Sequence, residues 1–96
     1  MKREEIIKCL KAQDIRLKEL DVRSLAVFGS VARDEARPDS DIDILVEFTG
    51  PATFDQYMRL KIFLEDLLKH PIDLVTRKGI RPQLASAIER EARRVA

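Results

Sequence analysis

Residues 25–46 read LAVFGSVARDEARPDSDIDILV, and this stretch determines the fold expected for the chain. Its first part is a short apolar run, typical of a buried strand, which ends in a small-residue turn at Gly29 and Ser30. Its last part opens a second predicted strand, residues 41–48, in which acidic and apolar side chains alternate. Side chains alternate across a strand, so the acids share one face and the apolar residues share the buried face.

The acids of the second strand are the strongest chemical signal. Asp41 and Asp43 share one strand face, about 7 Å apart, and Asp73 stands on a third predicted strand, residues 72–76. Like charges this close repel unless cations neutralise them or one acid takes up a proton. Mg²⁺ prefers carboxylates together with substrate phosphate oxygens. We therefore predict that the three aspartates are catalytic and bind two Mg²⁺ ions, whereas Glu47, on the same face, is solvated.

The turn between the strands suits a phosphate. Gly29 lets the backbone approach an anion because it has no Cβ, and Ser30 adds a hydroxyl donor. Arg33 follows one turn later with a planar fork of donors. Alone, a Gly-Ser pair is a common turn and alternating aspartates are a common solvent-facing pattern. Their combination, in order and on strands, predicts phosphoryl or nucleotidyl transfer.

The rest of the chain supplies helices around these strands. Helical spacing of apolar residues predicts a helix over residues 2–20, and the polar residues 34–40 read as an exposed loop. Thr53 opens a second helix with capping-box spacing, and Pro71 ends it. Pro82 suits the first turn of a final helix that continues through the arginines near the carboxyl end. The order predicts a small α/β or α+β unit with about three strands.

Composition narrows the function classes. The chain has 96 residues, which we interpret as one domain, and its net charge of +1 argues against a dedicated nucleic-acid binder. Its single cysteine, Cys9, excludes an internal disulfide and a cysteine-based zinc cluster, and reads as a packed small hydrophobe. We see no signal peptide and no apolar run near the ~20 residues of a membrane span. We therefore expect a soluble cytoplasmic protein with no membrane partner.

The motif, a Gly-Ser pair, ten residues and then Asp-Ile-Asp, resembles the signature of the DNA polymerase β-like nucleotidyltransferase superfamily. The longer match over residues 25–46, with the later PIDLVT of residues 71–76, resembles the minimal nucleotidyltransferase (MNT) family. The resemblance covers nearly all of residues 1–96. It implies a nucleotidyltransferase fold, a small mixed sheet with helices packed mainly on one face.

The resemblance also assigns roles to residues. Asp41 and Asp43 match the paired metal ligands of the family, and Asp73 matches its third carboxylate, which helps to activate the nucleophile. Gly29 and Ser30 match its nucleotide-phosphate turn. MNT proteins are commonly encoded beside a helical HEPN ribonuclease toxin. The resemblance therefore implies a type VII-like antitoxin that transfers AMP from ATP to a tyrosine of that HEPN partner.

Two alternatives remain open from the sequence. One is a binding module that neutralises a HEPN toxin by complex formation alone, and the other is a nucleotidyltransferase that acts on a small molecule. One residue departs from the family pattern, because Asp34 follows Arg33 where these proteins often have glycine. An added acid near the phosphate turn is expected to alter the loop or to weaken triphosphate binding.

Overall fold

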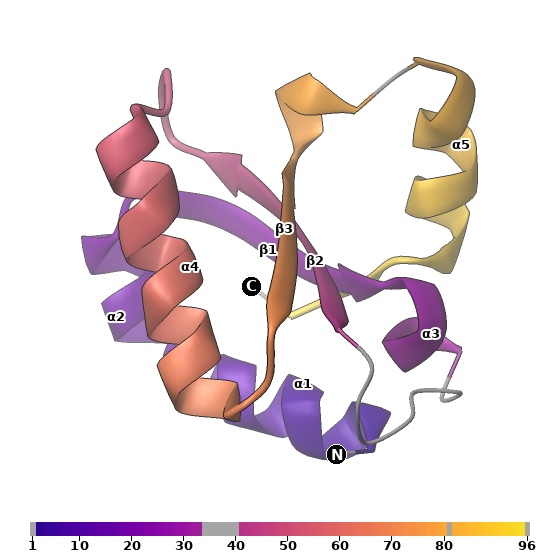
Figure 1. The fold of residues 1–96 in the computed structure, drawn as a ribbon, viewed down its shortest axis with the longest axis horizontal. Coiled ribbons are helices and arrows are strands. Elements are labelled where there is room, and N and C mark those ends of the chain that lie inside the picture. The colour runs from indigo at the N-terminus through magenta and orange to yellow at the C-terminus, as the bar shows by residue number, and fades with distance from the viewer. Residues whose placement is uncertain (1, 34–40, 81, 96) are drawn as a thin grey trace.

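The computed structural model describes residues 2–33, 41–80 and 82–95. Its centre is a four-stranded sheet in the order β3-β2-β1-β4 (Figure 1). The strands are β1 (Val22–Phe28), β2 (Ile42–Phe48), β3 (Ile72–Thr76) and the short β4 (Arg93–Arg94). The helices are α1 (Arg3–Lys11), α2 (Asp14–Glu19), α3 (Gly29–Ala32), α4 (Phe54–Leu68), the 3₁₀ turn η1 (Arg77–Gly79) and α5 (Pro82–Glu91).

Strand directions make this sheet mixed. β1 pairs antiparallel with β2 and with β4, whereas β2 pairs parallel with β3. A parallel neighbour needs a crossover connection, and α4 supplies it between β2 and β3. The mixed sheet expected from the family resemblance is therefore confirmed, with one more strand than the sequence indicated.

One face of the sheet, together with the helices that cover it, forms the core. Its apolar side chains alternate along β2, and α1, α2 and α4 contribute leucines and an isoleucine to the same cluster. The fully buried members are Ile6, Leu10, Leu17, Leu25, Val27, Ile44, Val46, Leu60, Leu64 and Leu68. Cys9 packs against this cluster as a partly buried side chain, as expected.

Helix α4 begins and ends with the signals read from the sequence. The Thr53 hydroxyl accepts a hydrogen bond from the Gln56 amide, and the Gln56 side chain accepts one from the Thr53 amide, completing the capping box. Lys69 adopts a left-handed conformation after the last turn. The Tyr57 hydroxyl donates a 2.6 Å hydrogen bond to the Leu74 carbonyl and so joins the helix to β3.

Two predictions about the chain ends were wrong. Residues 2–20 form two helices rather than one, because the backbone leaves helical geometry at Gln13 (φ −101°, ψ 22°). The final helix begins at Pro82 as expected but ends at Glu91, and Arg93–Arg94 forms a short edge strand on β1 instead.

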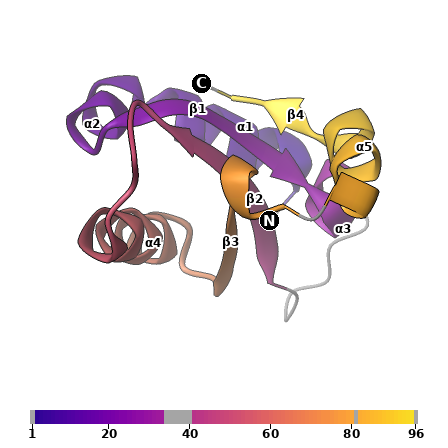
Figure 2. The same cartoon turned by 90° about the horizontal axis from the view of Figure 1, so that it is seen from above.

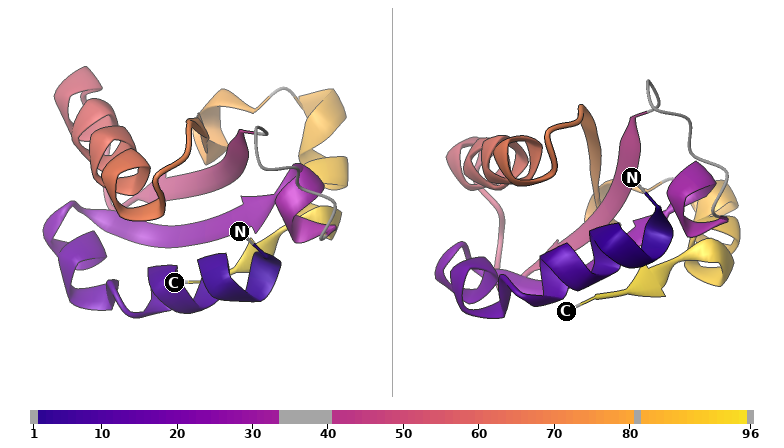
Figure 3. Two further views of the ribbon diagram at one scale, coloured as in Figure 1. Left: turned by 60° about the horizontal axis from the view of Figure 1, so that its bottom comes forward. Right: turned by 90° about the horizontal axis from the view of Figure 1, so that it is seen from below.

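The opposite face of the sheet is only partly covered. Helices α4 and α5 lie on opposite sides of the molecule, with α5 beside α3 and β4 (Figures 1 and 2). Helix α1 runs along the core side of the sheet, as Figure 3 shows. Among the described residues, no helix is long and apolar enough to cross a membrane.

Candidate active site

The carboxylates predicted from the sequence meet where β2 and β3 begin. Asp43 pairs directly with Asp73 across the parallel strands, and with Phe28 across the antiparallel pair. Directly paired residues project from the same face of a sheet, so the three side chains lie together on the partly covered face. The carboxyl groups of Asp43 and Asp73 are close enough to share a hydrogen bond.

Gly29 directly follows β1 and lies beside the carboxylate of Asp43. Its φ of 68° lies in the left-handed region, which favours glycine. A Cβ on Gly29 would clash with Oδ2 of Asp43. This position therefore requires glycine for two reasons, its backbone conformation and the room that it leaves beside the Asp43 carboxylate.

The electrostatics of Asp43 are unusual for a carboxylic acid. The pKa of Asp43 is raised to about 6. Burial is the largest cause, and the charges of Asp73 and Asp41 and the hydrogen bond to Asp73 also raise the pKa, whereas the Arg33 guanidinium lowers it. Such a carboxyl group holds its proton more readily than a free aspartic acid. A neighbouring cation would lower the pKa of Asp43 and favour its charged form.

Asp41 stands apart from the pair. It lies one residue before β2 and is exposed, although its charge still acts on Asp43. Within the described residues, no group of three or more histidine, cysteine or acidic side chains is arranged to hold a metal ion. The structure therefore brings two of the predicted ligands together, and the assignment of all three as metal ligands stays a prediction.

The remaining predicted residues surround the Gly29 turn. Ser30 lies in α3, and its side chain is outside what the structure describes. The Arg33 amide donates a 3.2 Å hydrogen bond to the Gly29 carbonyl, and its exposed guanidinium faces the charge of Asp43. Asp34 and the loop of residues 34–40 fall outside the described residues.

Sequence reasoning missed a chain of ion pairs farther along the same face. Glu47 was predicted to be solvated, but its carboxylate is one-third exposed and lies 3.5 Å from Arg23 and 3.4 Å from Arg77. Arg77 also lies 2.7 Å from Glu89 of α5. The alternation of β2 placed Glu47 on this face, but no local pattern indicated partners from β1, η1 and α5.

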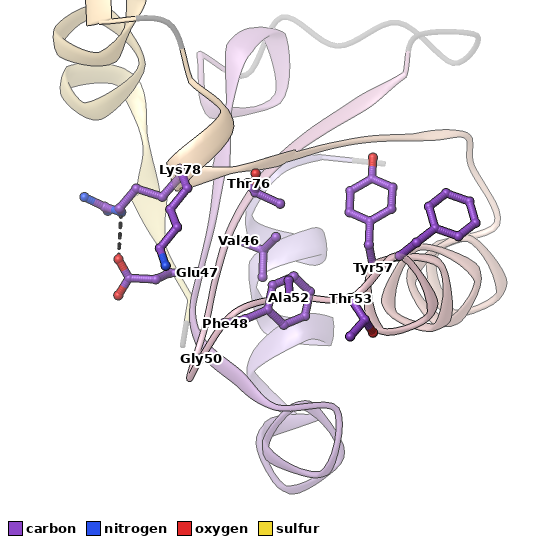
Figure 4. Close-up of a pocket in the computed structure, with 11 residues that line it drawn as sticks. Val46, Glu47, Phe48, Gly50, Ala52, Thr53, Tyr57, Thr76 and Lys78 are labelled. Atoms are coloured by element: carbon purple, nitrogen blue, oxygen red, sulfur yellow. Dashed lines mark ion pairs between the residues drawn. The ribbon is translucent and has the colours of Figure 1, made fainter.

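A cavity of about 330 Å³ lies at the other end of β2 (Figure 4). Phe48, Ala52 and Tyr57 line it on the apolar side, and Lys78 lies at its edge. None of the predicted site residues lines this cavity. The volume of the cavity therefore gives no reason to place the chemistry there rather than at the carboxylate pair.

Comparison with known proteins agrees with this geometry. Residues 4–95 match the family model described as a nucleotidyltransferase domain. The chain is 39% identical to the protein adenylyltransferase MntA of Thermococcus cleftensis over 89 residues, 92% of this chain and 90% of that protein. The chain therefore belongs to the nucleotidyltransferase domain family, and it is a nucleotidyltransferase.

Solved structures show the same fold. A structure described as a minimal nucleotidyltransferase superposes with a TM-score of 0.85 at 39% identity, covering 97% of this chain and 95% of that one. A toxin–antitoxin structure with AMP-PNP superposes with a TM-score of 0.75 at 20% identity, covering 90% and 72% of the two chains. A complex of a tri-AMPylated HEPN toxin with an MNT antitoxin from Shewanella oneidensis gives a TM-score of 0.68 at 18% identity, covering 94% and 71%.

Proposed function

We propose that residues 1–96 act as one minimal nucleotidyltransferase domain, which transfers AMP from ATP to a tyrosine hydroxyl of a HEPN toxin and so serves as its antitoxin. The observation that carries this proposal is the Asp43–Asp73 carboxylate pair beside Gly29. A pair of like charges on a partly covered face is costly for stability and has a use in phosphoryl chemistry.

The residues present suit Mg²⁺. The candidate ligands are all carboxylates, and the room at Gly29 leaves Oδ2 of Asp43 approachable. Mg²⁺ is usually held by one or two carboxylates together with substrate phosphates, so the pair meets its needs without a third converging acid. Asp43 and Asp73 would hold the ion, with Asp41 as a further ligand. When bound, it would polarise the phosphate undergoing transfer and neutralise the charge that develops there.

The side chains of this chain would then orient the reactants. The turn at Gly29 and Ser30 would face the nucleotide phosphates, and Arg33 would reach them with its guanidinium. Asp73 would draw the proton from the attacking hydroxyl. The new bond joins the hydroxyl oxygen to the α-phosphorus, the bond from the α-phosphorus to the bridging oxygen breaks, and pyrophosphate leaves.

The choice of acceptor and partner is supported by relatives. The MntA protein of Thermococcus cleftensis is named as a protein adenylyltransferase, and it matches this chain over nearly its full length. The AMPylated HEPN toxin of the Shewanella complex carries the product expected of such an activity. Both support a protein acceptor over a small molecule.

The test is intact-mass spectrometry of the HEPN protein encoded beside this chain, after incubation with ATP and Mg²⁺. We expect mass gains of whole AMP units with the natural sequence and with Asp66→Asn, a matched change at an exposed acid of α4. Asp43→Asn should abolish the gain. A stable complex without any mass gain would contradict the proposal and leave neutralisation by contact alone.

A further inference from the structure

A groove of about 480 Å³ lies between helices α2 and α4. Its lining combines apolar side chains with charges of both signs, and includes Arg16, Glu19, Arg59, Ile62, Phe63 and Asp66. The Arg16 guanidinium lies over the Phe63 ring, 5.8 Å from its centre, and so connects the two helices. We call this feature the α2–α4 groove.

The face of α4 that points away from the core carries a stripe of exposed side chains. The buried Leu60, Leu64 and Leu68 mark the opposite face of the helix. At spacings of 4, 3, 4 and 3 residues the stripe consists of Asp55, Arg59, Ile62, Asp66 and Lys69, the last of which directly follows the helix. All five residues are exposed, and this spacing keeps them in line, as in the seam of a coiled coil.

The order of charges makes this stripe complementary to itself. Along the chain it reads acid, base, isoleucine, acid, base. When a second copy of α4 runs antiparallel, Arg59 lies opposite Asp66 of that copy, and both isoleucines meet at the centre. In the same arrangement Asp55 lies opposite Lys69 of the second copy. A parallel copy in register would instead bring like charges together, which is unfavourable.

The charges of the stripe are not fully paired within one chain. Asp55 and Arg59 form an ion pair at 2.9 Å, but both side chains are about 70% exposed, so this pair contributes little to stability. Neither Asp66 nor Lys69 forms an ion pair with any residue that the structure describes. A second copy would therefore supply opposite charges that the single chain lacks.

Exposed apolar side chains accompany these charges. Ile62, at the centre of the stripe, is 52% exposed. On α2, Ile15 is 76% exposed and lies one helical turn before Glu19, which lines the groove. Covering this apolar surface removes it from water, which supplies a driving force that exposed ion pairs alone do not give.

We propose that the α2–α4 groove and the stripe of α4 form a homodimer interface, in which two α4 helices lie antiparallel about a two-fold axis at Ile62. A two-fold axis uses the same patch on both copies, so the assembly is closed and each intermolecular ion pair occurs twice. An interface of this kind buries less than the ~1,200 Å² of a standard interface. The dimer is therefore weak, with a dissociation constant on the order of 100 µM.

This dimer leaves both candidate active sites open. Helices α2 and α4 lie on one side of the molecule, whereas α5 and α3, which begins at Gly29, lie on the other (Figures 1 and 3). The homodimer therefore does not depend on the proposed nucleotidyl transfer. It also leaves the chain monomeric at the low micromolar concentrations of assays of AMP transfer and unfolding.

Sedimentation velocity tests the proposal, at concentrations from about 5 µM to 1 mM, which bracket the expected dissociation constant. Ile62→Asp places two like charges at the axis and should abolish the dimer. Arg59→Asp and Asp66→Arg each set like charges opposite one another, and each should weaken the dimer by about tenfold or more. The double variant Arg59→Asp/Asp66→Arg restores opposite charges and should dimerise to within about threefold of the natural chain.

The matched control is Arg90→Asp, the same charge reversal at an exposed residue of α5. It should dimerise like the natural chain, and thermal unfolding of every variant at low concentration checks that the fold is retained. A natural chain that is monomeric at every concentration would overturn the proposal, as would a dimer that survives both Ile62→Asp and Arg59→Asp. A double variant no better than either single variant would overturn the antiparallel geometry. A monomeric natural chain whose binding to the HEPN protein is weakened by Arg59→Asp would assign the stripe to that partner instead of a second copy.

Discussion

The two faces of β2 differ in what their side chains do. On one face Ile42, Ile44 and Val46 are buried in the core beneath α1, α2 and α4. On the other face Asp43 and Glu47 are partly exposed. Asp43 has a raised pKa, and Glu47 forms ion pairs. The same seven-residue strand therefore stabilises the fold with one set of side chains and carries the candidate chemistry with the other.

This division makes stability and activity separable by mutation. Changes on the apolar face should lower the free energy of unfolding and leave the chemistry of the folded fraction intact. Changes at the carboxylate pair should remove the chemistry and leave the fold intact or more stable.

The largest effect is expected at Asp43 on the acidic face. Asp43→Asn removes a charge that would hold the metal, and such metal contacts stabilise a transition state by several kcal/mol. AMP transfer should fall by about a hundredfold or more. The rate is measured by incorporation of AMP into the HEPN protein, and a fall of less than tenfold would contradict the role of Asp43.

The matched change on the apolar face is Ile44→Ala. Ile44 is fully buried, and removing such a side chain from a core costs about 2–5 kcal/mol of unfolding free energy. Urea unfolding should show this loss, whereas kcat of the folded protein at low temperature should stay near that of the natural chain. If kcat falls as far as in Asp43→Asn, the two faces are not separable.

Gly29→Ala should affect both properties. Its Cβ would meet Oδ2 of Asp43 and would also force a left-handed backbone on alanine, which costs about 1–2 kcal/mol. We expect the melting temperature to fall and AMP transfer to fall with it, because the carboxylate must move. An active variant with unchanged stability would show that the close approach at Gly29 is unimportant.

The smallest effect concerns pH and the metal-free protein. Folding raises the pKa of Asp43 from 3.8 to about 6, so its contribution to stability is full below pH 3.8 and is lost as the pH rises through 6. With EDTA at pH 7.5, Asp43→Asn should therefore be more stable than the natural chain by about 1 kcal/mol, allowing for partial exposure.

The measurement is thermal unfolding at several pH values, with Asp66→Asn as control. The difference between Asp43→Asn and the natural chain should shrink as the pH falls from 7.5 to 5. A difference that stays constant with pH would contradict a raised pKa at Asp43. Added Mg²⁺ should stabilise the natural chain and leave Asp43→Asn unaffected.

The sequence predicted the acidic strand because its signals are local. Alternation along β2 identifies both faces, and the capping box at Thr53 needs only residues within one helical turn. The break at Gln13 was not predictable, because neither proline nor glycine marks it and apolar spacing continues across it. Strand β4 was missed because two residues held only by backbone pairing with β1 leave no side-chain pattern.

Prediction of the candidate site from the sequence was limited in the same way. The sequence identified Asp43, Asp73 and Gly29, which the structure brings together. It could not show that Asp41 stands apart, since that depends on where β2 begins. Nor could it show the Arg77–Glu89 bridge, which arises from segments brought together only in the fold.

Anomalous diffraction from crystals grown with Mn²⁺ and AMP-PNP would locate the metal directly. We expect a manganese peak within coordination distance of the Asp43 and Asp73 carboxylates, with nucleotide phosphate oxygens completing the shell. The peak should be absent from Asp43→Asn crystals. Manganese and nucleotide bound elsewhere, with no metal at the Asp43–Asp73 pair, would contradict the assignment of the acidic face as the active site.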